Sequence, residues 1–247
     1  MPDRRAQKPA ALTISKVFVA GICLLFAGLT LWLAVPRAVA SVILFRAEGT
    51  LLEARLGRTL PPAKIDSLLA AQRSALWWSD AADTWIDNGY TLLYSTLQRP
   101  KTAKQVTLAA GRSLERGLSQ MPVNAEGWYW LAVVRHSTSG VSEKSASALR
   151  MSMFTGPHIP LLAVVRLRLM MRLWSLYDAD ERAAVYRHIR YSWSVAPDGV
   201  VDIALSTTND WPIRIALALQ PKDLARFEAM LNEAKKKAAE SSTKTSK

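Results

Sequence analysis

An uncharged run of apolar residues dominates the hydrophobic pattern of this chain. It covers residues 17–35, VFVAGICLLFAGLTLWLAV, and ends at Pro36 and Arg37. A helix rises about 1.5 Å per residue, so roughly 20 apolar residues cross a hydrocarbon core about 30 Å thick. Lipid offers the backbone no hydrogen-bond partners, which requires such a segment to be helical. The pattern predicts a transmembrane helix over residues 17–35.

A cleaved signal peptide and a buried core helix both account less well for this run. A signal peptide has a shorter apolar region of about 7–15 residues, followed by a small-residue site, for which Ala38-Val39-Ala40 would serve. A core helix of a soluble protein is seldom apolar on every face over such a length. An uncleaved anchor in the inner (plasma) membrane is therefore the preferred interpretation.

The flanking charges favour one orientation of the anchor by a narrow margin. Before the run lie Arg4, Arg5, Lys8 and Lys16, and after it lie Arg37, Arg46 and Arg55. The excess of basic residues on the cytoplasmic side of a span predicts a cytoplasmic tail over residues 1–16. The bulk of the chain is then expected on the periplasmic or extracellular side.

Beyond the span the pattern predicts helices almost throughout. Residues 38–45 are apolar but too few to span again, so they either prolong the helix past Pro36 or lie along the interface. Pro61-Pro62 breaks the chain before a short amphipathic helix at 63–76, within a juxtamembrane helical linker over 36–75. The last segment, 234–247, begins as helix, then loses its apolar residues and is predicted to be a disordered basic tail.

The pattern predicts an all-α domain over residues 76–233. Runs of alternating apolar and polar residues bracketed by hairpin turns, which would indicate β-strands, are nearly absent. One predicted helix, with Ser79 or Asp80 as its cap, places Trp78, Ala82, Trp85 and Gly89 on its inward face and Asp80, Asp83 and Asp87 opposite. Helix breaks are expected at 99–100, 121–122, 137–140, 155–160, 197–199 and 206–210.

A fixed spacing of small and large residues recurs in this domain. Seven residues carry it: Ala110, Leu114, Gly117, Pro122, Trp128, Leu131 and Ala132. Their offsets, A-x3-L-x2-G-x4-P followed by W-x2-L-A, suit two antiparallel helices that approach at small residues, with a proline ending the first. Later helices keep Leu149, Ser152 and Pro157, and Ile189, Ser192 and Pro197, near the same offsets.

This register resembles the tetratricopeptide repeat (TPR). Leu114 and Gly117 depart from that family's pattern, and the helix after Pro157 has Ala163 and Arg166 where tryptophan and leucine belong. The resemblance covers about residues 76–200, is good in one unit and degenerate in the rest. It implies an α-solenoid that binds protein partners on a concave surface, often beside envelope polysaccharide assembly or export.

Charge and cysteine content narrow the classes of function. The chain has a formal charge of +12, and the part after residue 36 carries 28 Lys and Arg against 19 Asp and Glu. These basic residues are scattered, and no known nucleic-acid-binding motif accompanies them, so nucleic acid is a disfavoured partner. A basic surface of this kind suits anionic lipid headgroups or an acidic partner. The single cysteine, Cys23, excludes an internal disulfide and a cysteine metal cluster.

Three groups of side chains are candidates for chemistry. The stripe of Asp80, Asp83 and Asp87 would hold a cation, but no histidine or cysteine accompanies it, so a solvated stripe is preferred. The tryptophans at helical spacing are expected in the core, except Trp77 and Trp130. Five arginines on the predicted helices around residues 160–190 form a predicted partner-binding set together with Trp130. The alternative is that these arginines pair internally with Asp178, Asp180 and Glu181. The members of this set are Arg166, Arg168, Arg172, Arg187 and Arg190, with His188 as a weak extension.

Motifs of common enzymes are missing from the sequence. It has no G-x-S-x-G, H-E-x-x-H, P-loop or G-x-G-x-x-G pattern, and no cofactor or metal is expected. The leading hypothesis is therefore a membrane-anchored scaffold or assembly factor that binds membrane-associated protein partners in the bacterial cell envelope. The alternative is a membrane-anchored module that binds glycan or lipid through exposed tryptophans and arginines, and an enzyme with an unrecognised site ranks third.

Overall fold

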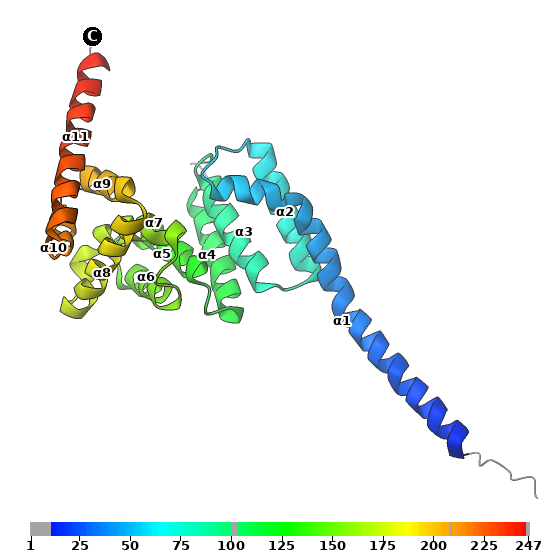
Figure 1. Ribbon diagram of the computed structural model, residues 1–247. Coiled ribbons are helices and arrows are strands. Elements are labelled where there is room, and N and C mark those ends of the chain that lie inside the picture. Colours follow the sequence, from blue (N-terminus) through cyan, green and yellow to red (C-terminus); the bar gives the residue numbers. More distant parts are fainter. Residues whose placement is uncertain (1–10, 100–102, 208, 246–247) are drawn as a thin grey trace, which may run out of the picture. The chain divides into compact units, whose positions relative to one another are not determined.

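The structure, a computed structural model, describes residues 11–99, 103–207 and 209–245 (Figure 1). Helices make up its secondary structure, and no strand occurs within the described ranges, which confirms the all-α prediction. The chain divides into two compact units, residues 1–84 and 85–247. The first ten residues of the predicted cytoplasmic tail lie outside the described residues.

One long helix, α1 (Ala11–Arg55), carries the apolar run of the first unit. It continues through Pro36, so the apolar residues 38–45 prolong the helix instead of starting a new one. From Phe18 onward it is long and apolar enough to cross a membrane, and the most apolar window has no buried residue. Leu24, Leu25 and Trp32 are exposed on it, as a lipid-facing helix requires.

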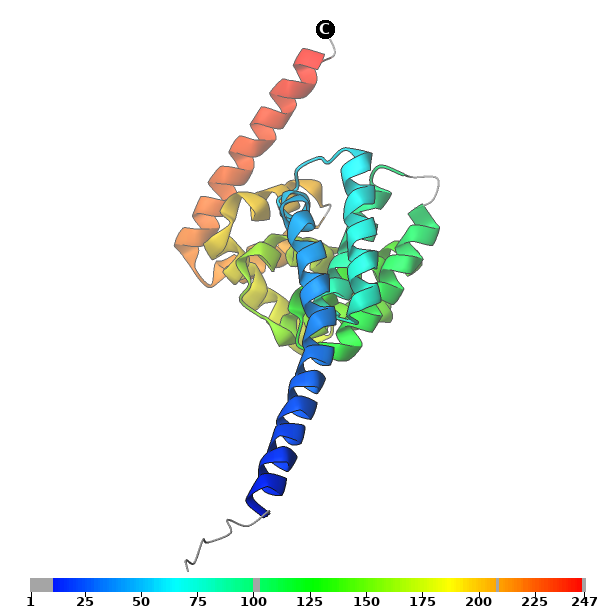
Figure 2. The ribbon, with the colours of Figure 1, turned by 90° about the vertical axis from the view of Figure 1, so that its right-hand side faces the viewer.

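The second half of α1 pairs with α2 (Pro62–Trp78) in an antiparallel hairpin, as Figures 1 and 2 show. The buried positions of α1 recur every seven residues and are all alanine, which lets the two backbones approach closely. The facing positions of α2 recur at intervals of three and four residues. The buried residues are Ala40, Ala47 and Ala54 on α1 and Ile65, Leu68, Gln72 and Ala75 on α2. At the turn, Lys64 Nζ lies 3.4 Å from Glu53 Oε2.

The second unit is an array of helices packed in adjacent pairs. Three helical hairpins come first: α3 (Ala82–Thr96) with α4 (Ala103–Gln120), α5 (Ala125–Ser139) with α6 (Glu143–Thr155), and α7 (Pro160–Arg172) with α8 (Ala179–Val195). A short 3-10 turn, Trp174–Leu176, follows α7. The array ends with α9 (Pro197–Ser206), α10 (Trp211–Ala218) and α11 (Pro221–Thr245).

Two features differ from the sequence prediction. Residues 79–81 separate α2 from α3, close to the predicted cap at Ser79 or Asp80, but Trp78 ends α2, so Trp78 and Trp85 belong to different helices and not to one inward face. The segment predicted as a disordered tail from residue 234 is helical through Thr245, because α11 continues to that residue.

The repeated spacing marks buried positions in all three hairpins. At the same offsets before a proline, the second helix of each hairpin buries a small or aliphatic residue, a large aliphatic residue and a glycine or serine. These triplets are Ala110, Leu114 and Gly117 on α4, Ser145, Leu149 and Ser152 on α6, and Val185, Ile189 and Ser192 on α8. Leu131 and Ala132 of α5 are buried as well. The hairpins therefore share one packing register over a chain span of about three repeats.

Local hydrogen bonds fix the turn between the first two hairpins. The indole Nε1 of half-buried Trp128 donates to the carbonyl of Pro122 at 2.8 Å. The side chain of Asn124 accepts a hydrogen bond from Gly127 N at 2.7 Å and caps α5. Trp128 and Pro122 thus act together, because the proline ends one hairpin and its carbonyl positions the first aromatic residue of the next.

The first helix of each hairpin also needs small residues where it crosses its partner. Gly89 on α3 stands four residues after Trp85, the same interval that separates Ala132 from Trp128. A Cβ at position 89 would lie 2.5 Å from Leu114 Cγ and 2.9 Å from Leu114 Cδ2. Beside it, Ser113 Oγ donates to Asn88 Oδ1 at 2.8 Å. The α3 and α4 backbones therefore approach closely at Gly89.

Candidate partner-binding face

Arg166 on α7 lies in the interior of the second unit. Its side chain is 0% exposed and makes three hydrogen bonds within the chain. Nε donates to Ser152 Oγ at 3.0 Å, Nη2 to Ser152 O at 2.7 Å and Nη1 to Gly156 O at 2.6 Å. Because its donors are used inside the protein, Arg166 has no exposed group for a partner, which corrects the expectation that it belongs to the binding set.

The hydrogen bonds of Arg166 extend into a buried polar network. Ser152 Oγ donates in turn to the carbonyl of Ala125 at 2.5 Å, which links α6 and α7 to the start of α5. Burial lowers the pKa of the Arg166 guanidinium to about 10, so it stays charged at neutral pH. The network satisfies this charge with hydroxyl and carbonyl oxygens instead of a carboxylate.

His188 on α8 belongs to the interior too. Its Nε2 donates to the carbonyl of Ala163 at 2.9 Å, and Ser192 Oγ donates to the same carbonyl at 3.2 Å. Burial lowers the pKa of His188 to about 4, and the positive charge of Arg166 acts in the same direction. The ring is neutral at pH 7 and does not extend an exposed basic surface.

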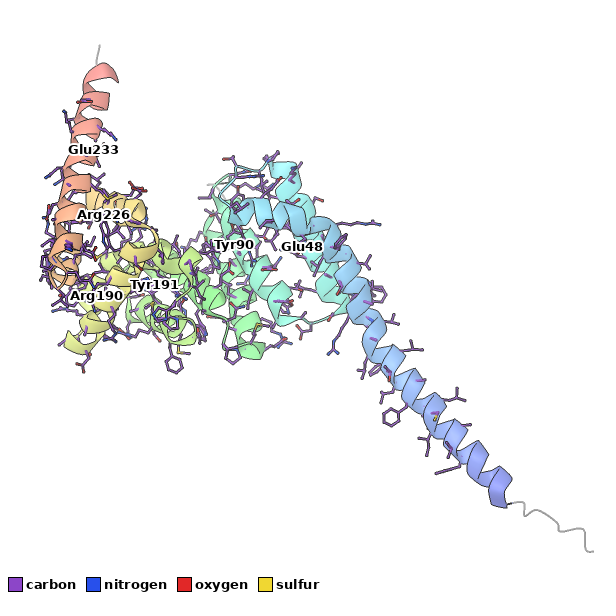
Figure 3. All side chains as sticks on the ribbon, in the orientation of Figure 1. Glu48, Tyr90, Arg190, Tyr191, Arg226 and Glu233 are labelled. Atoms are coloured by element: carbon purple, nitrogen blue, oxygen red, sulfur yellow. The ribbon has the colours of Figure 1, made fainter. Side chains whose placement is uncertain are left out.

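Aromatic side chains of α3 and α5 meet on the side of the array formed by the first helices of the hairpins. The Tyr90 ring (labelled in Figure 3) lies 4.8 Å from the Trp130 ring between centroids, and Trp130 lies 4.8 Å from Tyr129. Trp130 is half-buried, and its Nε1 donates to Glu126 Oε1 at 3.2 Å. Trp130 therefore contributes a partly exposed ring edge whose polar atom already has a partner.

Two arginines of α7 lie close to these rings. Burial raises the pKa of the Tyr129 phenol to about 12, while the charges of Arg168, Arg172 and Arg166 oppose that rise. Arg168 and Arg172 are exposed and stand one helical turn apart. Seven residues before Arg168, and so on the same side of α7, Leu161 is 87% exposed. These residues extend the aromatic row onto a third helix.

Neither Arg168 nor Arg172 forms an ion pair within the part of the chain that the structure describes. The acidic segment proposed as their internal partner is used elsewhere. Asp178 and Glu181 make a capping box at the start of α8, and Glu181 also pairs with Arg150. Two adjacent guanidinium groups are thus left facing solvent with all their donors available.

We call the surface formed by Trp130, Leu161, Arg168 and Arg172 the binding face. The buried rings of Tyr90 and Tyr129 pack against Trp130. Its residues come from α5 and α7, and Tyr90 of α3 supports the Trp130 ring. The remaining members of the predicted set, Arg187 and Arg190, lie on α8 (Arg190 is labelled in Figure 3). Arg187 is exposed and Arg190 is half-buried there.

The acidic stripe gives no metal site. Asp83 is in the first turn of α3 and its Oδ1 accepts a hydrogen bond from Thr84 N at 2.8 Å, whereas Asp80 precedes the helix. Over the described residues, no group of three histidine, cysteine, aspartate or glutamate side chains is placed to hold a metal ion. The stripe therefore adds nothing to the binding face.

The tryptophans divide between core and surface. Trp193 is buried, and Trp85, Trp128, Trp130 and Trp174 are half-buried. Trp77 is exposed, as predicted, but Trp78 and Trp211 are exposed as well, which the assignment of tryptophan to the core missed. Trp78 is the last residue of α2 and Trp211 is the first residue of α10, so helical spacing does not predict whether either side chain is buried.

Comparison with known proteins finds no family model that matches this chain and no matching curated protein.

One residue of the binding face, Leu161, escaped the sequence reasoning. The helical pattern assigns its apolar side chain to packing, although it is 87% exposed. One signal was available for Leu161: it shares the spacing of Arg168 and Arg172 on α7, so an exposed pair of arginines implies an exposed leucine on that side.

Proposed function

We propose that this chain is a membrane-anchored protein-interaction module that recruits a membrane-associated partner through the binding face. The single observation that carries the proposal is the pair Arg168 and Arg172, exposed and without internal carboxylates, on the same helix as exposed Leu161. Arginine is among the residue types that contribute most to protein–protein affinity, as is tryptophan, of which the half-buried Trp130 offers a ring edge.

The chemistry of the face defines the partner. Two guanidinium groups one turn apart bind carboxylates by charge-assisted, bidentate hydrogen bonds. Leu161 and the ring edge of Trp130 offer apolar contacts on either side. The proposed ligand is an acidic segment of the partner that carries at least one aliphatic or aromatic side chain.

The anchor and the array have complementary roles in this proposal. Helix α1 holds the chain in the membrane, with its N-terminus in the cytoplasm and the helical array on the periplasmic or extracellular side. The paired helices and their shared packing register support a divergent TPR-like array, and we propose a scaffold or assembly role in a bacterial envelope, with polysaccharide assembly or export as the pathway to examine first. The glycan alternative has less support, because the indole nitrogens of Trp128 and Trp130 are bonded internally.

The proposal is tested by capturing the tagged full-length chain from membranes in a mild detergent. In the R168E/R172E variant the partner's carboxylates face negative charge instead of positive charge. We therefore expect the amount of partner recovered with the tagged chain to fall at least about tenfold. The matched control is R112E/R116E, which reverses two exposed arginines with the same spacing on α4 and should leave recovery unchanged.

Circular dichroism of each purified variant establishes that the helices remain folded. Unchanged recovery with R168E/R172E would contradict the assignment of the face. Equal loss in both variants would show a nonspecific effect of net charge, and a wild-type chain with no companion would contradict the interaction module itself.

A further inference from the structure

Two adjacent tryptophans stand exposed at the end of α2. Trp77 is 78% exposed and Trp78 is 41% exposed, and their rings meet edge to face with centroids 4.9 Å apart. Both belong to the last turn of the helix that packs against α1. Their position relative to the apolar run of α1 can be worked out inside the first unit alone.

The register of the α1–α2 hairpin places these tryptophans beside the end of the apolar run. At the turn, Lys64 of α2 reaches Glu53 of α1. Thirteen residues further along α2 comes Trp77, and thirteen residues back along α1 comes Ala40, a distance of about 20 Å on either helix. Ala40 and Ala75 are both buried, and this register places them within one turn of the same level. Trp77 is thus level with Ala40, about 8 Å beyond Val35.

That level corresponds to the headgroup layer if the apolar run spans a bilayer. The polar layer on each side of a hydrocarbon core is about 5–8 Å thick, and tryptophan concentrates there because its ring is apolar and its indole N–H is polar. Two exposed arginines occupy neighbouring positions: Arg37 follows the run on α1, and Arg73 lies one turn before Trp77 on α2. Both suit phosphate groups of lipid headgroups.

We propose that Trp77 and Trp78 insert into the membrane interface and fix the depth of the anchor, so that the α1–α2 hairpin stands directly on the lipid surface. This inference rests on the proposed membrane span of α1. The occupant of the exposed tryptophan surface is the headgroup region of the bilayer that α1 crosses. The hairpin supplies the rigidity, because its antiparallel contact runs from the lipid surface to the Glu53–Lys64 turn.

The experiment is a depth measurement with nitroxide spin labels on the full chain in lipid nanodiscs. The native Cys23, exposed in the apolar run, is labelled as the internal reference. In a Cys23→Ser background, single labels are placed at Trp77→Cys and at Ser67→Cys, an exposed position near the other end of α2. We expect Cys23 to be relaxed strongly by oxygen, Ser67→Cys by a water-soluble nickel reagent, and Trp77→Cys to lie between them at headgroup depth.

The outcomes separate the inference from the span on which it rests. A Cys23 label deep in lipid with a Trp77→Cys label as accessible to nickel as Ser67→Cys would overturn the inference and leave the span standing. A water-accessible Cys23 label would overturn the span, and the inference with it.

A second measurement keeps both tryptophans in place. A label at Ser74→Cys, which is exposed one turn before Trp78, reports depth with the wild-type rings present. We expect W77A/W78A to move this label measurably toward water, and W211A, which removes an exposed tryptophan of the second unit, to leave it unchanged. An unmoved label in W77A/W78A would show that these rings do not set the depth.

Discussion

Arg166→Ala is expected to lower the free energy of unfolding of the second unit by about 3 kcal/mol. The substitution deprives the carbonyls of Ser152 and Gly156 of a buried donor, at roughly 1–3 kcal/mol for each unsatisfied group, and it leaves a cavity. Release of the desolvated charge offsets part of this cost. The measurement is thermal and denaturant unfolding of the full chain in detergent, followed by circular dichroism.

Two companion variants separate the causes of this effect. Arg166→Met fills most of the volume without donating hydrogen bonds, so its loss of stability should be intermediate. Arg168→Ala removes an exposed arginine of the same helix and should change stability by no more than about 0.5 kcal/mol. If Arg166→Ala were as stable as Arg168→Ala, the buried network would not be a stabilising element.

His188 is expected to make the second unit less stable as the pH falls from about 6.5 to about 4. Its pKa is near 6.5 in the unfolded chain and about 4 in the folded one, where burial disfavours the charged ring and the charge of Arg166 adds to that. Between these values the unfolded chain binds a proton that the folded chain does not, so stability is complete above pH 6.5 and declines below it. The full difference amounts to roughly 3 kcal/mol.

The His188 effect is measured as a difference between two pH profiles, because carboxylates titrate over part of the same range. His188→Gln retains a side-chain donor for the Ala163 carbonyl and does not titrate. Between pH 7 and pH 4.5 the wild type should lose about 2 kcal/mol more than His188→Gln. Parallel profiles would show that His188 is protonated in the folded chain at these pH values.

Local pattern was sufficient for most of the fold. Proline and glycine positions anticipated the breaks around residues 121–122, 137–140 and 155–160, and apolar periodicity identified the helices between them. The helix start near Ser79 and Asp80 was predicted, but Trp78 was assigned to the wrong helix because Trp78 and Trp85 are in phase across residues 79–81. The end of α11 was missed because a helix that leaves the core needs no apolar residue, only good helix formers such as alanine, glutamate and lysine.

The candidate site was less accessible to sequence reasoning, because burial is decided by tertiary contacts. Arg166, Arg168 and Arg172 look alike in the sequence, yet the first is buried and the other two are exposed. Arg166 is tolerated in the interior because hydrogen-bond acceptors of Ser152, on the preceding helix α6, and of Gly156, directly after α6, bind its guanidinium. No local pattern relates an arginine to a serine fourteen residues earlier.

The binding face is tested most directly by photo-crosslinking in native membranes. A benzophenone amino acid at Leu161 reports on the face while keeping both arginines, and the same group at Leu108, an exposed leucine of α4, is the matched control. We predict a defined crosslinked species from position 161 that disappears in the R168E/R172E background and is missing from position 108. Equal crosslinking from both positions, or a species from position 161 that survives the charge reversal, would contradict partner binding at this face.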